Sequence, residues 1–324
     1  MSRAILITFL LIAGISNSYS SSWWGFFAHK RINRLAVFTL PQEMIPFYKK
    51  HIVYLTENAV NPDRRRYAVE GEAPKHYIDL DIYGDSALQI MPHRWFDAVE
   101  KFTEDTLQAY GIGPWNVNLV KYQLTAAFKK GDVDRILRLS ADLGHYIGDI
   151  NVPLHTTENY NGQLTGQYGI HGFWESRLPE LYSDDYNYLV GTAKYIDNTQ
   201  EEAWKAVTNA HMALDSVLSF EKELSEKFPE SKKYSFEARG AVTTKVYSRK
   251  FSESFHKMLD GQVERRMLAS VKMVGDFWYT CWVDAGQPDM NKMLLKDLTE
   301  SQQKKLEEDI KKWNERKIKS REHN

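Results

Sequence analysis

The chain has 324 residues, of which 43% are hydrophobic and 13% aromatic, and its formal net charge is −1. This composition supports a packed core and excludes an intrinsically disordered chain. The near-neutral charge excludes a global basic field for nucleic acid or membranes, although bound metal ions would add local positive charge that side-chain counting misses.

The first residues have the order of an export signal. Arg3 precedes an apolar run from Ala4 to Ile15, and the small residues Ser20 and Ser22 follow. The run is too short for a bilayer span, which needs about 20 apolar residues. We therefore expect a signal peptide over residues 1–22 and a periplasmic or secreted protein. The mature domain would cover residues 23–286, followed by a polar helical tail over 287–324.

Apolar residues recur with helical spacing through most of the chain. Helices are predicted over Asp132–Asp149, with Asp132 as N-cap, and over Thr199–Phe228. Phe236–Trp282 reads as one or two further helices with a break near Gly261 or Gly275. No run alternates like a strand, so the predicted fold is all-α, a compact multi-helix bundle. Thr299 and Gln302 suggest a capping box for a helix in the tail.

Two stretches look irregular, 58–74 and 151–172, because both are interrupted by proline and glycine. A loop as long as the second one, inside a helical domain, is usually functional. The single cysteine, Cys281, lies among aromatic residues and has no partner for an internal disulfide. We expect it to pack in the core.

Five histidines are followed by an acid four residues later, a spacing that places both on one helical face. The pairs are His93–Asp97, His145–Asp149, His171–Glu175, His211–Asp215 and His256–Asp260. His211 and His256 lie in long charged helices without other ligands nearby in sequence, so we interpret them as surface or core residues. Pro153 must end the helix of His145 and Asp149, which brings His155 close to that helix end.

The run Leu143-Gly-His-Tyr-Ile-Gly-Asp-Ile-Asn-Val-Pro-Leu-His155 resembles the core signature of a known superfamily. That superfamily contains the zinc-dependent phospholipases C and the single-strand-specific, fungal-type zinc nucleases, with exported bacterial members. Further elements match in the same order over about half of the chain. They are Trp24-Gly25 with His29, Asp63 in Asn-Pro-Asp-Arg, His76-Tyr-Ile-Asp79, and His171-Gly-Phe-Trp-Glu175.

The resemblance implies three zinc ions. The first would be held by Asp63, His76, His145 and Asp149, and the second by His155, His171 and Glu175. The third would be held by His29, by Asp149 as a bridge, and by the backbone amine and carbonyl of an N-terminal Trp24. In this sequence Trp23 precedes Trp24, so the mature N-terminus could be either residue.

The same resemblance suggests roles around the ions. Asp63 would orient the attacking water and Arg66 would brace the developing charge, unless Arg64–Arg66 is only a solvated basic loop. Tyr77 would stack on a base or pack on a lipid headgroup, with plain core packing as the alternative. Asp79 would accept a hydrogen bond from the substrate or orient a metal-binding histidine.

The predicted activity is phosphodiester hydrolysis by metal-activated water. Single-stranded nucleic acid or nucleotides are the leading substrate, and phospholipid is the alternative. Glu175 stands where the nucleases have aspartate and the phospholipases have glutamate, whereas the Trp-Gly start and His-Tyr-Ile-Asp resemble the nucleases. A third hypothesis, a non-catalytic zinc-stabilised binding protein, fits less well because structural zinc sites usually use cysteine. The sequence indicates no obligate protein partner.

Overall fold

The computed structural model describes residues 26–239 and 242–293, together with positions 301, 304, 308 and 311. The predicted export signal, Trp24 and the capping box of the tail lie outside the described residues. None of the described helices is long and apolar enough to traverse a bilayer.

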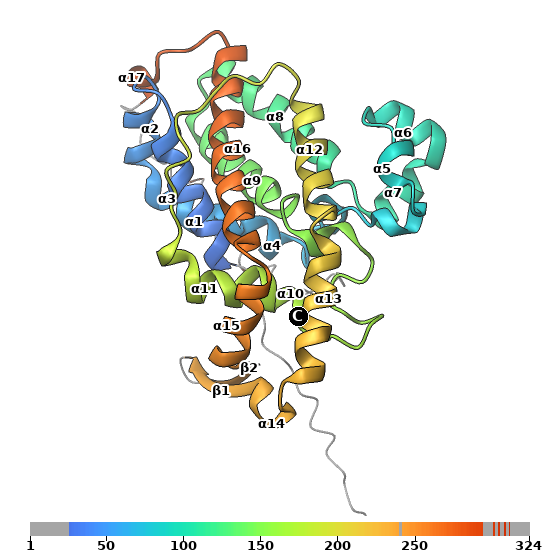
Figure 1. Ribbon diagram of the computed structural model, residues 1–324. Helices are drawn as coiled ribbons and strands as arrows, with labels where there is room; N and C mark the ends of the chain where they lie inside the picture. The colour runs from blue at the N-terminus through green and yellow to red at the C-terminus, as the bar shows by residue number, and fades with distance from the viewer. Residues whose placement is uncertain are drawn as a thin grey trace, which may run out of the picture.

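The fold is mostly α-helical, as predicted, and a set of its helices forms one bundle (Figure 1). The bundle contains α1 (Phe26–Ala36), α2 (Ile45–Lys50), α3 (Ile52–Glu57), α4 (Asn61–Arg65), α8 (Gly113–Lys130), α9 (Val133–Asp149), α12 (Thr199–His211) and α16 (Gln262–Asp284). Around it lie α5 (Ala87–Ile90), α6 (Trp95–Phe102), α7 (Glu104–Tyr110), α10 (Ile170–Gly172), α11 (Leu178–Tyr182), α13 (Leu214–Lys227), α14 (Glu230–Lys233), α15 (Arg249–Met258) and α17 (Met290–Met293).

Short helical turns connect these elements. They are the 3-10 turns η1 (Val37–Thr39), η2 (Asn58–Val60), η3 (Ala73–His76), η4 (Leu80–Tyr83), η5 (Pro153–Thr156) and η7 (Ser183–Asp185), and the π-helical turn η6 (Phe173–Arg177). The stretches expected to be irregular, 58–74 and 151–172, contain only such turns and the short α4 and α10.

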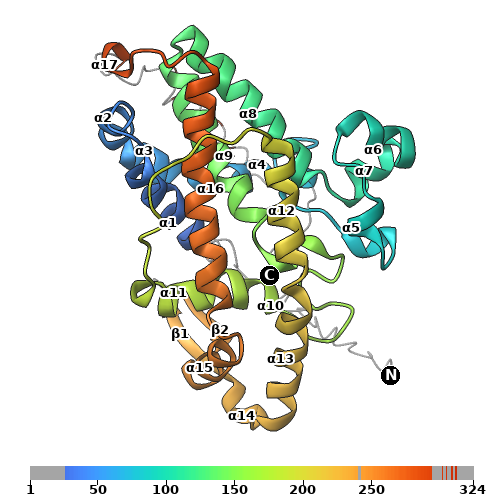
Figure 2. The ribbon, with the colours of Figure 1, turned by 45° about the horizontal axis from the view of Figure 1, so that its top comes forward.

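Helix α9 lies at the centre of the bundle, where it packs against α1, α8 and α16 (Figures 1 and 2). It begins as predicted, because the Asp132 side chain accepts a hydrogen bond from the Arg135 N–H at 3.1 Å. It ends at Asp149, before Pro153. Every residue from Leu139 to Asp149 is buried, so the polar side chains in this part of α9 lie in the interior. Cys281 of α16 is also buried, as expected.

Two of the predicted helices were wrong in part. The stretch 199–228 is broken after His211, and α13 starts afresh at Leu214. The prediction of helix from Phe236 onward is contradicted by an antiparallel hairpin, β1 (Tyr234–Arg239) and β2 (Val242–Tyr247), in which Tyr234 pairs with Tyr247. Aromatic and β-branched residues favour strands here, and the ring of Tyr247 stacks on Phe173 of η6 with centroids 3.9 Å apart.

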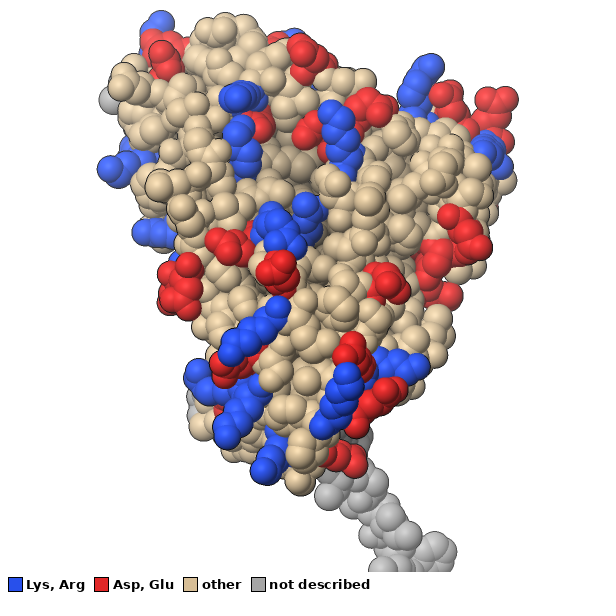
Figure 3. All heavy atoms as spheres, viewed as in Figure 1, with Lys and Arg blue, Asp and Glu red and all other residues tan. Residues whose placement is uncertain are grey.

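The predicted break near Gly261 is confirmed, since this glycine has φ +71° and separates α15 from α16. Gly275 does not break α16. A Cβ there would lie 1.9 Å from Thr39 Oγ1 of η1, so this glycine serves close packing of the chain segments instead. On the face shown in Figure 3, basic and acidic side chains are interspersed, in keeping with the net charge of −1.

Candidate metal centre

Two glycines of α9 allow helix α1 to approach it closely. A Cβ at Gly148 would lie 2.8 Å from His29 Nδ1, and one at Gly144 would lie 1.9 Å from Asn33 Oδ1. The glycines and their partners are each spaced by four residues, so they share one face of their helices. Glycine at both positions brings His29 of α1 next to Asp149 of α9.

The first group of predicted ligands converges on the carboxyl-terminal end of α9. His76 Nδ1 lies 3.1 Å from His145 Nε2 and 2.9 Å from Asp149 Oδ2. His145 Nε2 lies 3.2 Å from the same oxygen. Asp63 Oδ1, from α4, lies 3.8 Å from His76 Nδ1 and 3.7 Å from His145 Nε2. Four side chains from three elements therefore face one point.

The second group is formed by η5, α10 and η6. His155 Nε2 lies 3.1 Å from His171 Nε2 and 3.4 Å from Glu175 Oε2. His171 Nε2 lies 2.7 Å from that oxygen. Glu175 is in the π-helical turn η6, a distortion that often occurs at functional sites. The hairpin helps to hold η6 in place, because Phe173, two residues before Glu175, stacks on Tyr247.

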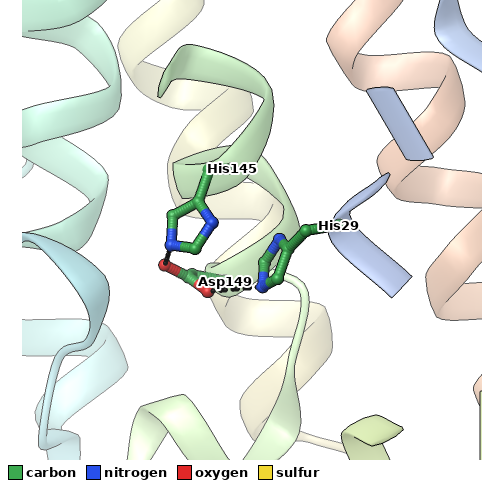
Figure 4. A group of neighbouring side chains, drawn as sticks. All are labelled: His29, His145 and Asp149. Atoms are coloured by element: carbon green, nitrogen blue, oxygen red, sulfur yellow. Dashed lines mark ion pairs between the residues drawn. The ribbon is translucent and has the colours of Figure 1, made fainter. Parts of the chain in front are cut away.

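His29 lies beside both groups. Its Nε2 atom is 3.3 Å from Asp149 Oδ1 and 3.1 Å from Glu175 Oε1. Figure 4 shows Asp149 between His29 and His145, with one carboxylate oxygen directed at each ring. The two rings stack with centroids 4.0 Å apart. The predicted backbone ligand of this third position, Trp24, lies outside the described residues.

These donor sets fit zinc. Ligand atoms of a tetrahedral zinc ion with bonds of about 2.05 Å are about 3.3 Å apart. Most of the separations above lie between 2.7 and 3.4 Å, with the Asp63 oxygen slightly farther out. Three groupings within the cluster bring at least three donor atoms close enough to share an ion. Asp149 Oδ1 is buried and accepts no hydrogen bond within the described residues, which is costly unless a cation is nearby.

Backbone carbonyls orient two of the rings. His145 Nδ1 donates to the Ala59 carbonyl at 2.9 Å, and His155 Nδ1 donates to the His76 carbonyl. In both rings this leaves the Nε2 lone pair directed into the cluster, the arrangement that metal-binding histidines use.

A network of charged residues that the sequence analysis missed lies behind the first group. Arg65 donates to Asp142 of α9 at 3.2 and 3.0 Å and to Glu72 at 3.2 Å. Tyr146 of α9 donates to Glu72 through a very short hydrogen bond. Arg65 and Glu72 lie on the segment that carries Asp63 and His76. The network thus ties that segment to α9 without any ion. The sequence offered little signal for it: Arg65 comes two residues after Asp63, and Glu72 comes four residues before His76.

The electrostatics keep the carboxylates ionised. Burial disfavours the charge on Asp149 and Glu175, but the surrounding histidines outweigh it and hold both pKa values well below the usual range. Burial lowers the pKa of His76 to about 4, with further lowering by Arg66 and His145. For His29, burial is outweighed by the adjacent carboxylates of Asp149 and Glu175, which favour its charged form, so its pKa is well above the usual value.

The remaining predicted residues lie around this cluster. Arg66 is 2% exposed, and its Nη1 atom lies 3.6 Å from Asp63 Oδ1. Burial is the main cause of the lowered pKa values of His76 and His171. The charge of Arg66 lowers both pKa values further, so Arg66 lies near both groups. Tyr77 is half-buried with its ring against Gly111, and Asp79 is buried with its N–H bonded to the Tyr110 carbonyl at 2.8 Å.

The other histidines with acids four residues later do not join the cluster. His93 bonds to Glu201 at 2.9 Å and stacks on Trp204. His211 bonds to Thr156 Oγ1 at 3.0 Å, and His256 bonds to the Tyr186 hydroxyl at 2.9 Å. The contacts of His211 and His256 agree with their interpretation as surface or core residues.

No model of a known protein family matches this chain, and no curated protein matches it. Among solved structures, it is similar to an alpha-toxin of Clostridium perfringens isolated from avian strain SWCP, with a TM-score of 0.49 and 14% sequence identity. The alignment covers 83% of this chain and 66% of the toxin chain. The present chain therefore spans just under two thirds of the length of that toxin.

Proposed function

We propose that the protein is an exported, zinc-dependent hydrolase of phosphodiester bonds that binds three zinc ions. The observation that carries this proposal is the convergence of His76, His145 and Asp149 on one point and of His155, His171 and Glu175 on another, at the separations of zinc ligands. The sites are built from imidazole and carboxylate, the donor types of catalytic zinc, whereas structural zinc sites usually use cysteine.

Bound zinc would supply Lewis acidity, which activates water at neutral pH and offsets phosphate charge. The chain itself contributes the groups that orient the reactants. The Asp63 side chain is 14% exposed, more than the carboxylates of Asp149 and Glu175, so it is the acid best placed to accept a hydrogen bond from water. Arg66, whose Nη1 atom lies 3.6 Å from Asp63 Oδ1, adds a fixed positive charge that would stabilise the negative charge developing on a phosphate oxygen.

Single-stranded nucleic acid or nucleotides are our first proposal for the substrate. Tyr77 directly follows the ligand His76 and is only half-buried, so part of its ring remains available to a base. Stacking of a base on an aromatic ring contributes about 1–3 kcal/mol. Asp79 is only 3% exposed, so little of it could contact a substrate. Its burial favours the alternative role, in which it orients a metal-binding histidine.

Phospholipid is a second candidate because of the loop before His171. Leu164 and Tyr168 of that loop are each 66% exposed, and Met212 at the break between α12 and α13 is 73% exposed. The loop contacts α13 through a hydrogen bond from Gln167 to the Leu218 carbonyl at 2.8 Å, and α13 in turn contacts η5, which carries His155. Exposed apolar side chains of this kind tolerate a lipid surface.

The test combines elemental analysis with a substrate panel. The purified exported protein should contain about three zinc ions and should cleave bis-p-nitrophenyl phosphate. Tyr77→Ala should raise KM for single-stranded DNA or RNA strongly while leaving hydrolysis of the small diester nearly intact. Active protein without stoichiometric zinc would refute the metal assignment. Rapid cleavage of phosphatidylcholine micelles with no action on nucleic acid would replace the first substrate by the second.

A further inference from the structure

Asp149 and Glu175 are placed in the same way relative to His29. Asp149 directs Oδ2 at the first ligand group and Oδ1 at His29 Nε2, 3.3 Å away. Glu175 directs Oε2 at the second ligand group and Oε1 at the same His29 nitrogen, 3.1 Å away. Both carboxylates are almost fully buried, with side-chain exposures of 1% and 6%. Each acid therefore uses both of its oxygens inside the cluster.

The distances to His29 are those expected of atoms that share one metal ion. Ligand atoms of a tetrahedral zinc ion lie about 3.3 Å apart. The family resemblance implies that Asp149 binds two ions but that Glu175 binds the second ion alone. Both acids nevertheless contact the same His29 nitrogen, and the Glu175 oxygen is slightly closer to it than the Asp149 oxygen is.

The length of glutamate matters for this arrangement. Glu175 reaches in from the π-helical turn η6, four residues after His171, and its Oε2 contacts the His171 ring at 2.7 Å. An aspartate at this position would hold its carboxylate one methylene, about 1.5 Å, closer to the backbone. Its carboxylate would retract toward η6, so the contact with His171 on the same segment would remain and the contact with His29 of α1 would be lost.

We propose that Glu175 is a shared ligand, which binds the second zinc ion and completes the third position together with His29 and Asp149. This inference rests on the proposed function, because it requires the cluster to hold metal. Its consequence is that three side chains can hold the third ion by themselves. Binding there would not depend on whether the mature chain begins at Trp23 or at Trp24.

The experiment compares wild type, Glu175→Asp, His29→Ala and the double variant by zinc content after dialysis against a zinc buffer. We expect Glu175→Asp to bind one ion at least tenfold more weakly, because even outer-sphere changes at metal sites cost about 10–100-fold in affinity. The double variant should lose no more zinc than His29→Ala, because an aspartate that keeps its contact with His171 still serves the second ion and gives up only the third. Glu253→Asp, a glutamate exposed on α15, is the matched control and should bind as wild type does.

A second arm extends the mature N-terminus by two residues, which should leave the third ion bound. Loss of an ion on extension, with Glu175→Asp unchanged, would overturn the inference. If Glu175→Asp does not fold, an anomalous-scattering map of the wild-type zinc protein decides. Glu175 Oε1 should lie about 2.0–2.2 Å from the ion at His29, and a separation above about 3 Å would contradict the inference. Wild type without bound zinc would instead refute the proposed function.

Discussion

Gly144→Ala tests whether close packing of α1 on α9 holds the centre together. The added Cβ would lie 1.9 Å from Asn33 Oδ1. Asn33 cannot easily move, because it is fully buried and its Nδ2 donates to the Leu55 and Ala141 carbonyls at 3.3 and 3.0 Å. Accommodating the Cβ therefore strains the packing of α1 on α9 and also disrupts both hydrogen bonds.

The magnitude follows from three contributions. Overpacking costs about 1–3 kcal/mol, and two hydrogen bonds contribute about 0.5–1.5 kcal/mol each. The better helix propensity of alanine returns about 1 kcal/mol. The expected loss is therefore about 3 kcal/mol, or roughly 6–12 °C in Tm for a domain of this size.

Thermal unfolding followed by circular dichroism measures this loss, once with zinc and once with chelator. Gly172→Ala is the matched control: it lies between the ligands His171 and Glu175, has φ −62°, and a Cβ there would meet nothing within 4 Å. Adding Asn33→Ala to Gly144→Ala should recover part of the stability, because it removes the atom that clashes. If Gly144→Ala unfolds at the wild-type temperature, the packing argument is wrong.

Three further predictions concern the network and the metal. Tyr146→Phe removes the hydroxyl that donates to Glu72, and we expect zinc affinity to fall about 10-fold in a competition titration with a chelator; unchanged affinity would show that the network does not organise the site. In the metal-free protein, Arg65 and Lys75 outweigh burial and lower the pKa of Glu72 from 4.5 to about 2. Its contribution, up to about 3 kcal/mol, is present above pH 4.5 and is lost as pH falls towards 2, so Glu72→Gln should flatten the acid side of a stability-against-pH curve, and a parallel curve would contradict this. Zinc removal should lower Tm in a calorimetric scan, because ion binding contributes to folding free energy; an identical Tm with chelator would count against a metal centre.

The sequence by itself determined the helical character of the chain and most of the members of the cluster. Helical spacing and the N-cap Asp132 located α9, and Pro153 located its end, because these signals are local. The histidines and acids from His29 to Glu175 were assigned by their resemblance to the motifs of the zinc phospholipase and nuclease superfamily, and the structure brings them together. The hairpin was missed because each strand has only six residues, and its position depends on the stacking of Tyr247 on Phe173 from a distant segment.

Only the tertiary structure decided what surrounds the cluster. Arg65 and Glu72 belong to one segment and Asp142 and Tyr146 to another, so their network exists only when α4 and α9 are packed together. The reason for Gly144 and Gly148 is likewise invisible in the chain, because each makes room for a side chain more than a hundred residues away. The same holds for Glu175: its second oxygen meets His29 from a distant helix, and spacing along a sequence carries no record of such contacts.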